Sequence, residues 1–216
     1  MSLLKNMMIS ASILTLFTSS LAAKTVVDTW ELVSDEDDVA SYIKPNSEGG
    51  LVSIRGIGTV SATTQQTLKV LQNLEETPQW SPYLSEIRVL EDRGNAGLVT
   101  YIRMAAPWPV SDRYFITIRT VEQLADGGFL LRQKSVEHPR AHWLHDDQIL
   151  GTMNYSSIQV NPSSDGQGSK IVMESSSDPK GDIPQAIINR SQRSAALDFF
   201  RGLRQQIRKK IAQGSL

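Results

Sequence analysis

The longest regular pattern in the sequence lies at its C-terminal end, where helical periodicity runs from about Pro184 to Ile211. On a helical wheel the apolar side chains of this segment fill one broad arc, formed by Ile188, Ala195, Ala196, Phe199, Phe200, Leu203 and Ile207. A helix of this kind is stable when its apolar side packs against another layer. The rest of the chain must therefore supply a large surface that faces one long helix.

The segments before this helix have the features of β-strands separated by turns. Runs rich in β-branched and aromatic residues, bounded by turn residues, predict strands at Leu51–Val60, Ile87–Glu91, Leu98–Met104, Arg113–Val121, Phe129–Val136, Ile149–Val160 and Lys170–Ser175. Gly56 and Gly58 predict a bend or bulge in the first of them. The pattern indicates an α+β fold in which an antiparallel sheet wraps a C-terminal helix.

Two shorter helices are expected near the N-terminal side of this sheet. The acidic segment after Asp28 predicts a short helix that leads into a strand near Val39–Lys44. A second helix is expected to be capped by Ser61 and to stop before Pro78, because leucine and valine recur at helical spacing between them.

Composition fits a single soluble domain. The 216 residues are 40% hydrophobic and 21% charged, which excludes both a disordered chain and a polytopic membrane protein. The chain has no cysteine. Disulfides, zinc–thiolate sites, iron–sulfur clusters, thiol catalysis and a cysteine-linked lipid anchor are therefore excluded.

The first residues are typical of a secretory signal peptide. A start with one lysine precedes the uncharged stretch Met7–Phe17, and Ser20-Leu21-Ala22 is a cleavage site of small residues before Ala23. We expect residues 1–22 to be removed and residues 23–216 to form one domain that is periplasmic or secreted. The alternative is an uncleaved anchor, because the segment from Met7 to Ala23 is close to the shortest length that spans a bilayer.

Charge is unevenly distributed along the chain. From Asn189 onward seven basic residues stand against the one acid Asp198, whereas six acids and no base fall between Asp28 and Asp38. Five arginines share an arc of the long helix beside its apolar arc: Arg190, Arg193, Arg201, Arg204 and Arg208. This stripe could dock on an anionic membrane, could balance the acids Asp35–Asp38 within the molecule, or could be a solvated face. Export argues against nucleic acid as a partner.

Three stretches of the sequence resemble one known family. A helix leads into Gln79-Trp80-Ser81-Pro82, a proline-rich turn leads into a strand over Pro107–Phe115, and a loop leads into the long helix over Asp178–Asn189. Together they resemble the START family, the lipid-transfer domains related to the steroidogenic acute regulatory protein, and suggest a bacterial exported member. Tyr114 stands where the family usually has an acidic residue.

The resemblance implies a helix-grip fold, in which a curved antiparallel sheet closes around the C-terminal helix and leaves a hydrophobic tunnel. It implies lipid or sterol binding without catalysis and without a cofactor, and we expect a monomer that docks transiently on anionic membrane through the five arginines. The ligand-binding residues expected from the resemblance and from the strand and helix faces are Ile102, Met104, Arg113, Phe115, Arg119, Ala196, Phe199, Phe200 and Leu203.

Two features of this expected site leave alternatives open. Ala195 and Ala196 could let the helix stand off the sheet, or could simply permit close packing. Arg113 and Arg119 share one face of a strand, and a buried charge needs a partner. For Arg119 that partner is a polar group of the ligand, a distant acid such as Glu174, or water if the side chain faces outward.

Metal binding and catalysis have less support. His142 and His145 could share a helical face near His138, but the segment contains Pro139 and is expected to be a loop, so no metal site is predicted. No Gly-x-Ser-x-Gly motif is present. The superfamily also contains polyketide cyclases. A small-molecule enzyme is therefore the alternative function, and it would need two or more titratable groups converging in the cavity.

Overall fold

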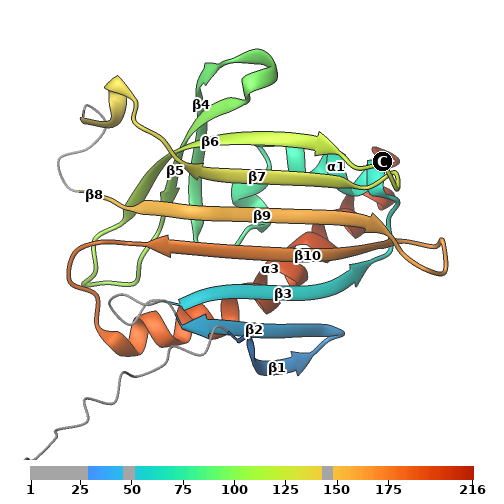
Figure 1. The fold of residues 1–216 in the computed structure, drawn as a ribbon, viewed down its shortest axis with the longest axis horizontal. Helices are drawn as coiled ribbons and strands as arrows, with labels where there is room; N and C mark the ends of the chain where they lie inside the picture. Colours follow the sequence, from blue (N-terminus) through green and yellow to red (C-terminus); the bar gives the residue numbers. More distant parts are fainter. Residues whose placement is uncertain (1–28, 46–51, 143–147) are drawn as a thin grey trace, which may run out of the picture.

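One large antiparallel sheet lies across a long C-terminal helix in the computed structural model, which describes residues 29–45, 52–142 and 148–216 (Figure 1). The strands are β1 (Glu31–Glu36), β2 (Val39–Pro45), β3 (Val52–Val60), β4 (Leu84–Asp92), β5 (Leu98–Met104), β6 (Arg113–Gln123), β7 (Phe129–Ser135), β8 (Ile149–Leu150), β9 (Thr152–Pro162) and β10 (Ser169–Asp178). The helices are α1 (Thr64–Gln72), α2 (Thr77–Trp80) and α3 (Gln185–Ala212), with the 3-10 turns η1 (Gly94–Ala96) and η2 (Pro139–His142).

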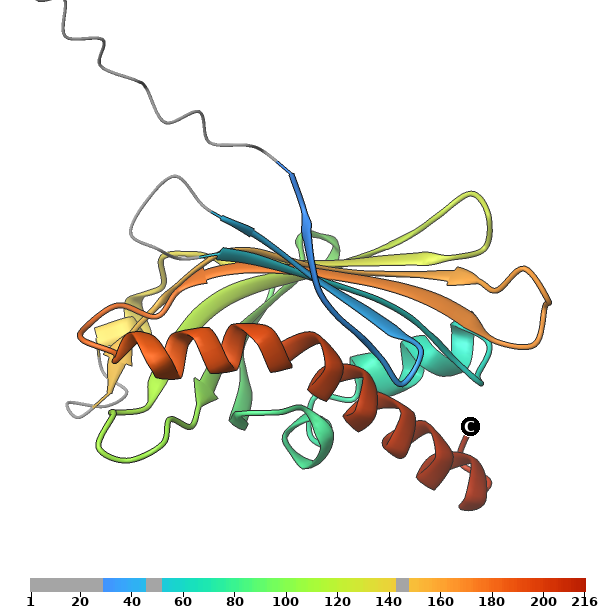
Figure 2. The same cartoon turned by 90° about the horizontal axis from the view of Figure 1, so that it is seen from below.

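The strand order is β1-β2-β3-β10-β9-β7-β6-β5-β4, and all neighbours on this path are antiparallel. The short β8 lies off the path and pairs in parallel with the start of β6. Because β1 and β4 end the order without pairing to each other, the sheet is open. The sheet curves over α3, and α1 lies on the same side (Figure 2). The predicted α+β helix-grip architecture is therefore confirmed.

The strand bounds agree closely with the sequence where turn residues mark both ends of an apolar run. β5 covers the predicted Leu98–Met104 residue for residue. The run expected at Ile149–Val160 is two strands, because the chain changes partner at Gly151. A Cβ at Gly151 would lie 2.4 Å from Cε1 of Phe115, so this crossing needs glycine.

The predicted helix after Asp28 is wrong, because β1 occupies this segment as the first half of a hairpin with β2. Asp37 and Asp38 form its turn with positive φ angles of 52° and 56°. β1 is an edge strand whose residues are exposed or half-buried, so the alternation that identifies a strand in a sequence is missing.

Two smaller expectations also need correction. Thr63, not Ser61, caps α1, and it forms a reciprocal capping box with Gln66: Gln66 N donates to Thr63 Oγ1 at 3.2 Å and Thr63 N donates to Gln66 Oε1 at 3.0 Å. Gly56 and Gly58 make no bulge, because β3 pairs with β2 and β10 through both positions without a register shift.

The predicted signal peptide and cleavage site lie outside the described residues, and their prediction stands as an expectation. His145 and the acids beside it also lie outside them. In the part of the chain that the structure describes, no helix has the length and apolar character needed to cross a membrane.

Candidate functional site

The inner face of the sheet, which looks toward α3, is apolar where it meets α1 and the C-terminal half of α3. The sheet contributes Val39, Val60, Phe129, Leu131, Val160, Ile171 and Met173, and the helices contribute Leu68, Val70, Leu71, Ala196, Leu197, Phe199, Phe200, Leu203 and Ile207. Phe200 and Leu203 have no exposed surface. This half of the inner face is a packed core.

The contact between α3 and β3 is close because of the two glycines. A Cβ at Gly56 would lie 2.9 Å from the Ala196 Cβ, and one at Gly58 would lie 2.9 Å from Cε1 of Phe200. These distances are below normal contact, so a larger residue at either position would push the helix away. At Ala196 the structure therefore shows the close packing that the sequence left as one of two alternatives.

The C-terminal half of α3 is also fixed by polar contacts. Gln206, which is buried, donates to Glu76 at 2.6 Å, and Lys210 pairs with the same carboxylate at 2.5 Å. The hydrogen bond from Lys210 is the main reason that the pKa of Glu76 lies below its usual value. The predicted lining residues Phe199, Phe200 and Leu203 thus belong to a part of α3 that is held by both packing and polar contacts.

The other half of the inner face, nearer to the start of α3, has a different character. Thr100 and Thr117 are fully buried and their hydroxyl oxygens lie 2.9 Å apart, and Gln133 donates to Thr117 Oγ1 at 2.7 Å. Ile102 and Phe115 are neighbours across β5 and β6, and both are buried. Neither belongs to one of the two apolar clusters of buried residues, so this region is separate from the packed core.

Arg119 stands beside this polar region on the same face of β6. Its Nη2 donates to the carbonyl oxygen of Leu71 at 2.7 Å, and no carboxylate of the described residues pairs with it. Burial lowers the pKa of its guanidinium to about 10. Glu174 is not its partner, because Glu174 lies on the outer face and pairs with Arg55 at 2.7 Å.

Arg113, also predicted to bind ligand, has a structural task in this arrangement. Its guanidinium donates to the carbonyl oxygens of Ser111, Pro179 (3.3 Å) and Lys180 (3.1 Å), and burial lowers its pKa. The side chain thus ties the loop before β6 to the loop before α3. These are two of the stretches on which the family resemblance rests. Met104, at the end of β5, pairs with Arg113 in the ladder and is half-buried.

The arginine stripe of α3 is divided between two roles. Arg201 pairs with the Asp37 carboxylate at 2.7 Å, and Arg204 donates to the carbonyl oxygens of Asp37, Asp38 (3.3 Å) and Thr59 (2.9 Å). These two arginines therefore hold the turn between β1 and β2, as the intramolecular alternative expected. The remaining three are exposed and form no ion pair with the described residues: Arg190, Arg193 and Arg208.

One exposed side chain was not singled out by the sequence. Trp108, in the loop between β5 and β6, has 92% of its surface exposed. This loop lies beside the N-terminal half of α3 (Figure 2). The signal was present as Pro107-Trp108-Pro109, which was interpreted from the sequence only as a proline-rich turn that resembles the family's.

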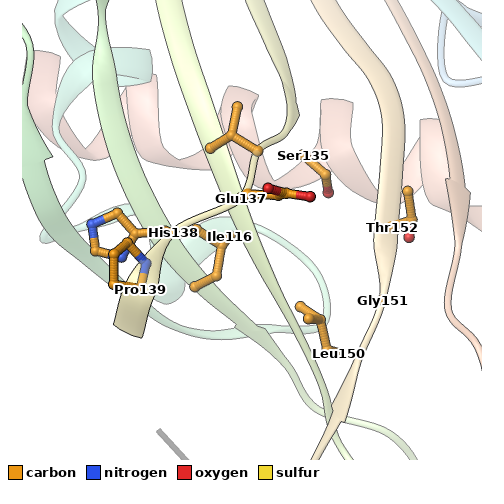
Figure 3. Close-up of a pocket in the computed structure, with 9 residues that line it drawn as sticks. Ile116, Ser135, Glu137, His138, Pro139, Leu150, Gly151 and Thr152 are labelled. Atoms are coloured by element: carbon orange, nitrogen blue, oxygen red, sulfur yellow. The ribbon is translucent and has the colours of Figure 1, made fainter. Parts of the chain in front are cut away.

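The pocket shown in Figure 3 lies on the opposite, outer face of the sheet and has a volume of about 870 Å³. It is lined by Ile116, Ser135, Val136, Glu137, His138, Pro139, Leu150, Gly151 and Thr152. None of these residues was predicted as a ligand contact. His138, one of the histidines considered above, lies 3.7 Å from Glu91, and the described residues hold no group of three metal-type ligands.

Comparisons with known proteins agree with this geometry. The START domain family model matches residues 19–212. The chain is 24% identical over 195 residues to an uncharacterized protein of Pseudomonas aeruginosa, covering 88% of this chain and 92% of that protein. It is 22% identical over 178 residues to the phosphatidylcholine transfer protein of Bos taurus, covering 81% and 82%. The crystal structure of human STARD10 shares the fold, with a TM-score of 0.76 at 18% identity over 85% of this chain and 75% of that chain.

Proposed function

Because the chain belongs to the START domain family, we propose that it binds one lipid or other hydrophobic molecule between the sheet and the N-terminal half of α3, and carries or presents it outside the cytoplasm. The observation that carries the proposal is the division of the inner face. One half is a packed core, and the other holds buried hydroxyl, amide and guanidinium groups beside Ile102 and Phe115. A core needs no such groups, whereas a bound molecule with an apolar body and a polar end does.

The physical need for a carrier follows from the cost of exposing hydrocarbon to water. Transfer of one methylene group from water to an apolar site is favourable by about 0.8 kcal/mol of free energy. For a chain of roughly 16 carbons the total is on the order of 10 kcal/mol. A protein that encloses such a chain offsets most of the cost of leaving a membrane.

Arg119 supports a ligand with an anionic end. A desolvated guanidinium that donates to only one carbonyl oxygen keeps several donors unused, and a carboxylate or phosphate would accept two of them side by side. Since the described residues offer no carboxylate here, the ligand would supply the missing charge. Arg113 would not serve this purpose, because the three loop carbonyls occupy its guanidinium.

Docking on membranes is the second part of the proposal. We assign it to the first half of α3 instead of to the whole arginine stripe. Trp108 is exposed in a loop beside the N-terminal half of α3, which carries the exposed Arg190 and Arg193 (Figure 2). An indole and basic side chains on one side of a protein are suited to a membrane interface. Arg201 and Arg204 would contribute less, since the β1–β2 turn holds them. Replacement of Trp108 by alanine should weaken binding to anionic vesicles and leave the unfolding free energy unchanged within about 0.5 kcal/mol.

Mass spectrometry under native conditions tests the carrier function directly. Mature protein isolated from its own compartment should hold one lipid per chain. Thr117→Trp should fill the polar half and empty the protein, whereas the matched change Ser157→Trp, on the outer face of β9, should leave the lipid bound. Protein that is empty in every preparation and that transfers no lipid between vesicles would contradict the proposal. Turnover of a small molecule by that empty protein would favour the enzyme instead.

A further inference from the structure

The outer pocket arises where the edge of β6 changes partners. β7 pairs with β6 as far as Ser135, and Val136 N then donates to the Ile116 carbonyl at 3.0 Å. Two residues nearer the start of β6, Gly151 N donates to the Tyr114 carbonyl at 2.9 Å, and β8 replaces β7 as the neighbouring strand. β7 and β9 separate at this point, where Ser135 Oγ accepts from Met153 N at 2.8 Å in place of a backbone bond. The pocket occupies the resulting seam.

This pocket is separate from the inner face described above. Ile116 points to the opposite side of β6 from Phe115 and Thr117, because successive residues of a strand alternate between faces. Phe115 closes the seam from the inside, since its ring fits against Gly151 so closely that a Cβ there would overlap it. Ser135 pairs with Thr117 in the ladder, so it borders the seam from the inner side. A molecule that covers Ile116 and Leu150 lies across the sheet from Thr100 and Thr117.

The lining of the pocket combines apolar surface with one available charge. Ile116, Val136, Pro139 and Leu150 provide the apolar part, and Leu150 keeps 39% of its surface exposed. The Glu137 carboxylate lies among these residues close to Ser135 (Figure 3), and the described residues give it no hydrogen-bond or ion-pair partner. None of the described residues that line the pocket is a lysine or an arginine.

His138 does not change this balance. Its Nδ1 accepts from the backbone N of Arg140 at 3.2 Å, and its Nε2 faces the Glu91 carboxylate at 3.7 Å. The histidine is thus engaged at the rim, and Glu137 is the charged group left to meet a ligand. A carboxylate beside apolar surface attracts a cation that carries an apolar body and repels an anion of the same shape.

We propose that the outer pocket between β7, β8 and β9 is a second binding site, and that it takes a small amphiphilic cation, an ammonium group on a short apolar chain. The ammonium would pair with Glu137 and donate to the hydroxyl oxygens of Ser135 or Thr152. The chain would cover Leu150 and Ile116. This site does not depend on the lipid carrier function, because it uses the other face of the sheet.

Backbone amide chemical shifts measured with three matched probes test the site. Octylamine should shift the signals of residues 135–138 and 150–152, octanol should shift them with lower affinity, and octanoate should bind at least tenfold more weakly than octylamine. Shifts confined to inner residues such as Thr100 and Thr117, or equal binding of octylamine and octanoate, would overturn the proposal.

Two variants with the same charge change locate the cation. Glu137→Gln should weaken octylamine binding about fivefold or more and leave octanol binding unchanged, because only the ammonium uses the carboxylate. Glu122→Gln removes an exposed acid of β6 that pairs with Arg132, and it should have no effect. Leu150→Ser should weaken all three probes. If Glu137→Gln and Glu122→Gln behave alike, the attraction is only that of the whole surface and the site is refuted.

Discussion

The two halves of α3 meet the same sheet in opposite ways. From Ala196 onward the helix packs against Gly56 and Gly58, and Glu76 before α2 and Asp37 in the β1–β2 turn hold its polar side chains. Before Ala196 the helix is held more lightly: the hydroxyl of Ser194 lies 3.3 Å from that of Tyr83, at the start of the β4–β5 side of the sheet. One helix therefore serves both as a structural anchor and as the cover of the proposed binding site.

This division implies that stability and ligand binding can be changed separately. Residues that a sequence groups into one apolar arc fall into the two regions according to what lies opposite them on the sheet. Substitutions on either side of the boundary should then differ in kind, and the four changes below test this from the largest expected effect to the smallest.

Phe200→Ala should have the largest effect, a loss of about 4 kcal/mol in the free energy of unfolding, because a fully buried ring leaves a cavity in a packed core. Phe115→Ala, a matched change in the other half, should lose at least about 1 kcal/mol less, since Phe115 lies outside both apolar clusters. Denaturant unfolding of the lipid-free protein measures both. Equal losses would mean that the two halves form one continuous core.

Charge reversal separates the two groups of arginines. Arg190→Glu with Arg193→Glu should weaken binding to anionic vesicles by more than tenfold at low salt, since each basic residue near such a surface contributes about 1 kcal/mol. Arg201→Glu with Arg204→Glu changes the net charge equally. It should lower stability more and vesicle binding less, because it disrupts the β1–β2 turn. Vesicle sedimentation measures binding for both pairs. The same loss of vesicle binding for the two pairs would mean that the whole arginine stripe docks on the membrane.

Arg119→Met should weaken binding of an anionic lipid about tenfold and leave a neutral lipid of equal chain length bound as before. The stability of the lipid-free protein should stay within about 1 kcal/mol, because a desolvated cation with no carboxylate adds little. Since the folded pKa is about 10, the arginine is charged below that pH, and affinity for the anionic lipid should fall as pH rises through 10. Fluorescent lipid displacement measures this, and a flat pH profile would argue for a structural arginine.

The smallest effect concerns acid stability of the anchored half. The folded pKa of Glu76 lies below its usual 4.5, so its pair with Lys210 stabilises the fold above that pH and is lost as pH falls through the folded pKa. Thermal melts should show Glu76→Gln less stable than the parent at neutral pH, with the difference shrinking in acid. Glu75→Gln, the neighbouring acid, serves as the control and should follow the parent.

The overall fold could be predicted because its main signals are local. β5 is a short run of mainly apolar and β-branched residues between turns, and α3 carries an apolar arc, so local patterns alone predict both. β1 could not be found this way, because an edge strand with exposed faces has no periodicity and its acids favoured another interpretation.

The sites were harder to predict because they depend on distant contacts. Arg113 is buried, as expected, but its acceptors are carbonyl oxygens 66 and 67 residues further along, and no sequence pattern names a carbonyl. The sequence correctly placed Ala196 and Phe200 on the apolar arc of the helix. Only the contacts with Gly56 and Gly58 show that no space for a ligand remains between β3 and α3 at these residues. The outer pocket depends on one strand replacing another at Ile116, which leaves no periodic signal.

The open edges of the sheet have a consequence for a protein that is expected to fold after export. An unpaired strand edge offers backbone groups to any extended chain and is a usual starting point for aggregation. β1 shifts register between Leu32 and Ser34 and carries acids at both ends, and β4 shifts register twice and alternates glutamate with arginine near Glu86. Irregular, charged edges of this kind oppose the pairing of one copy with another, so the sheet can stay open without joining its neighbours into fibres.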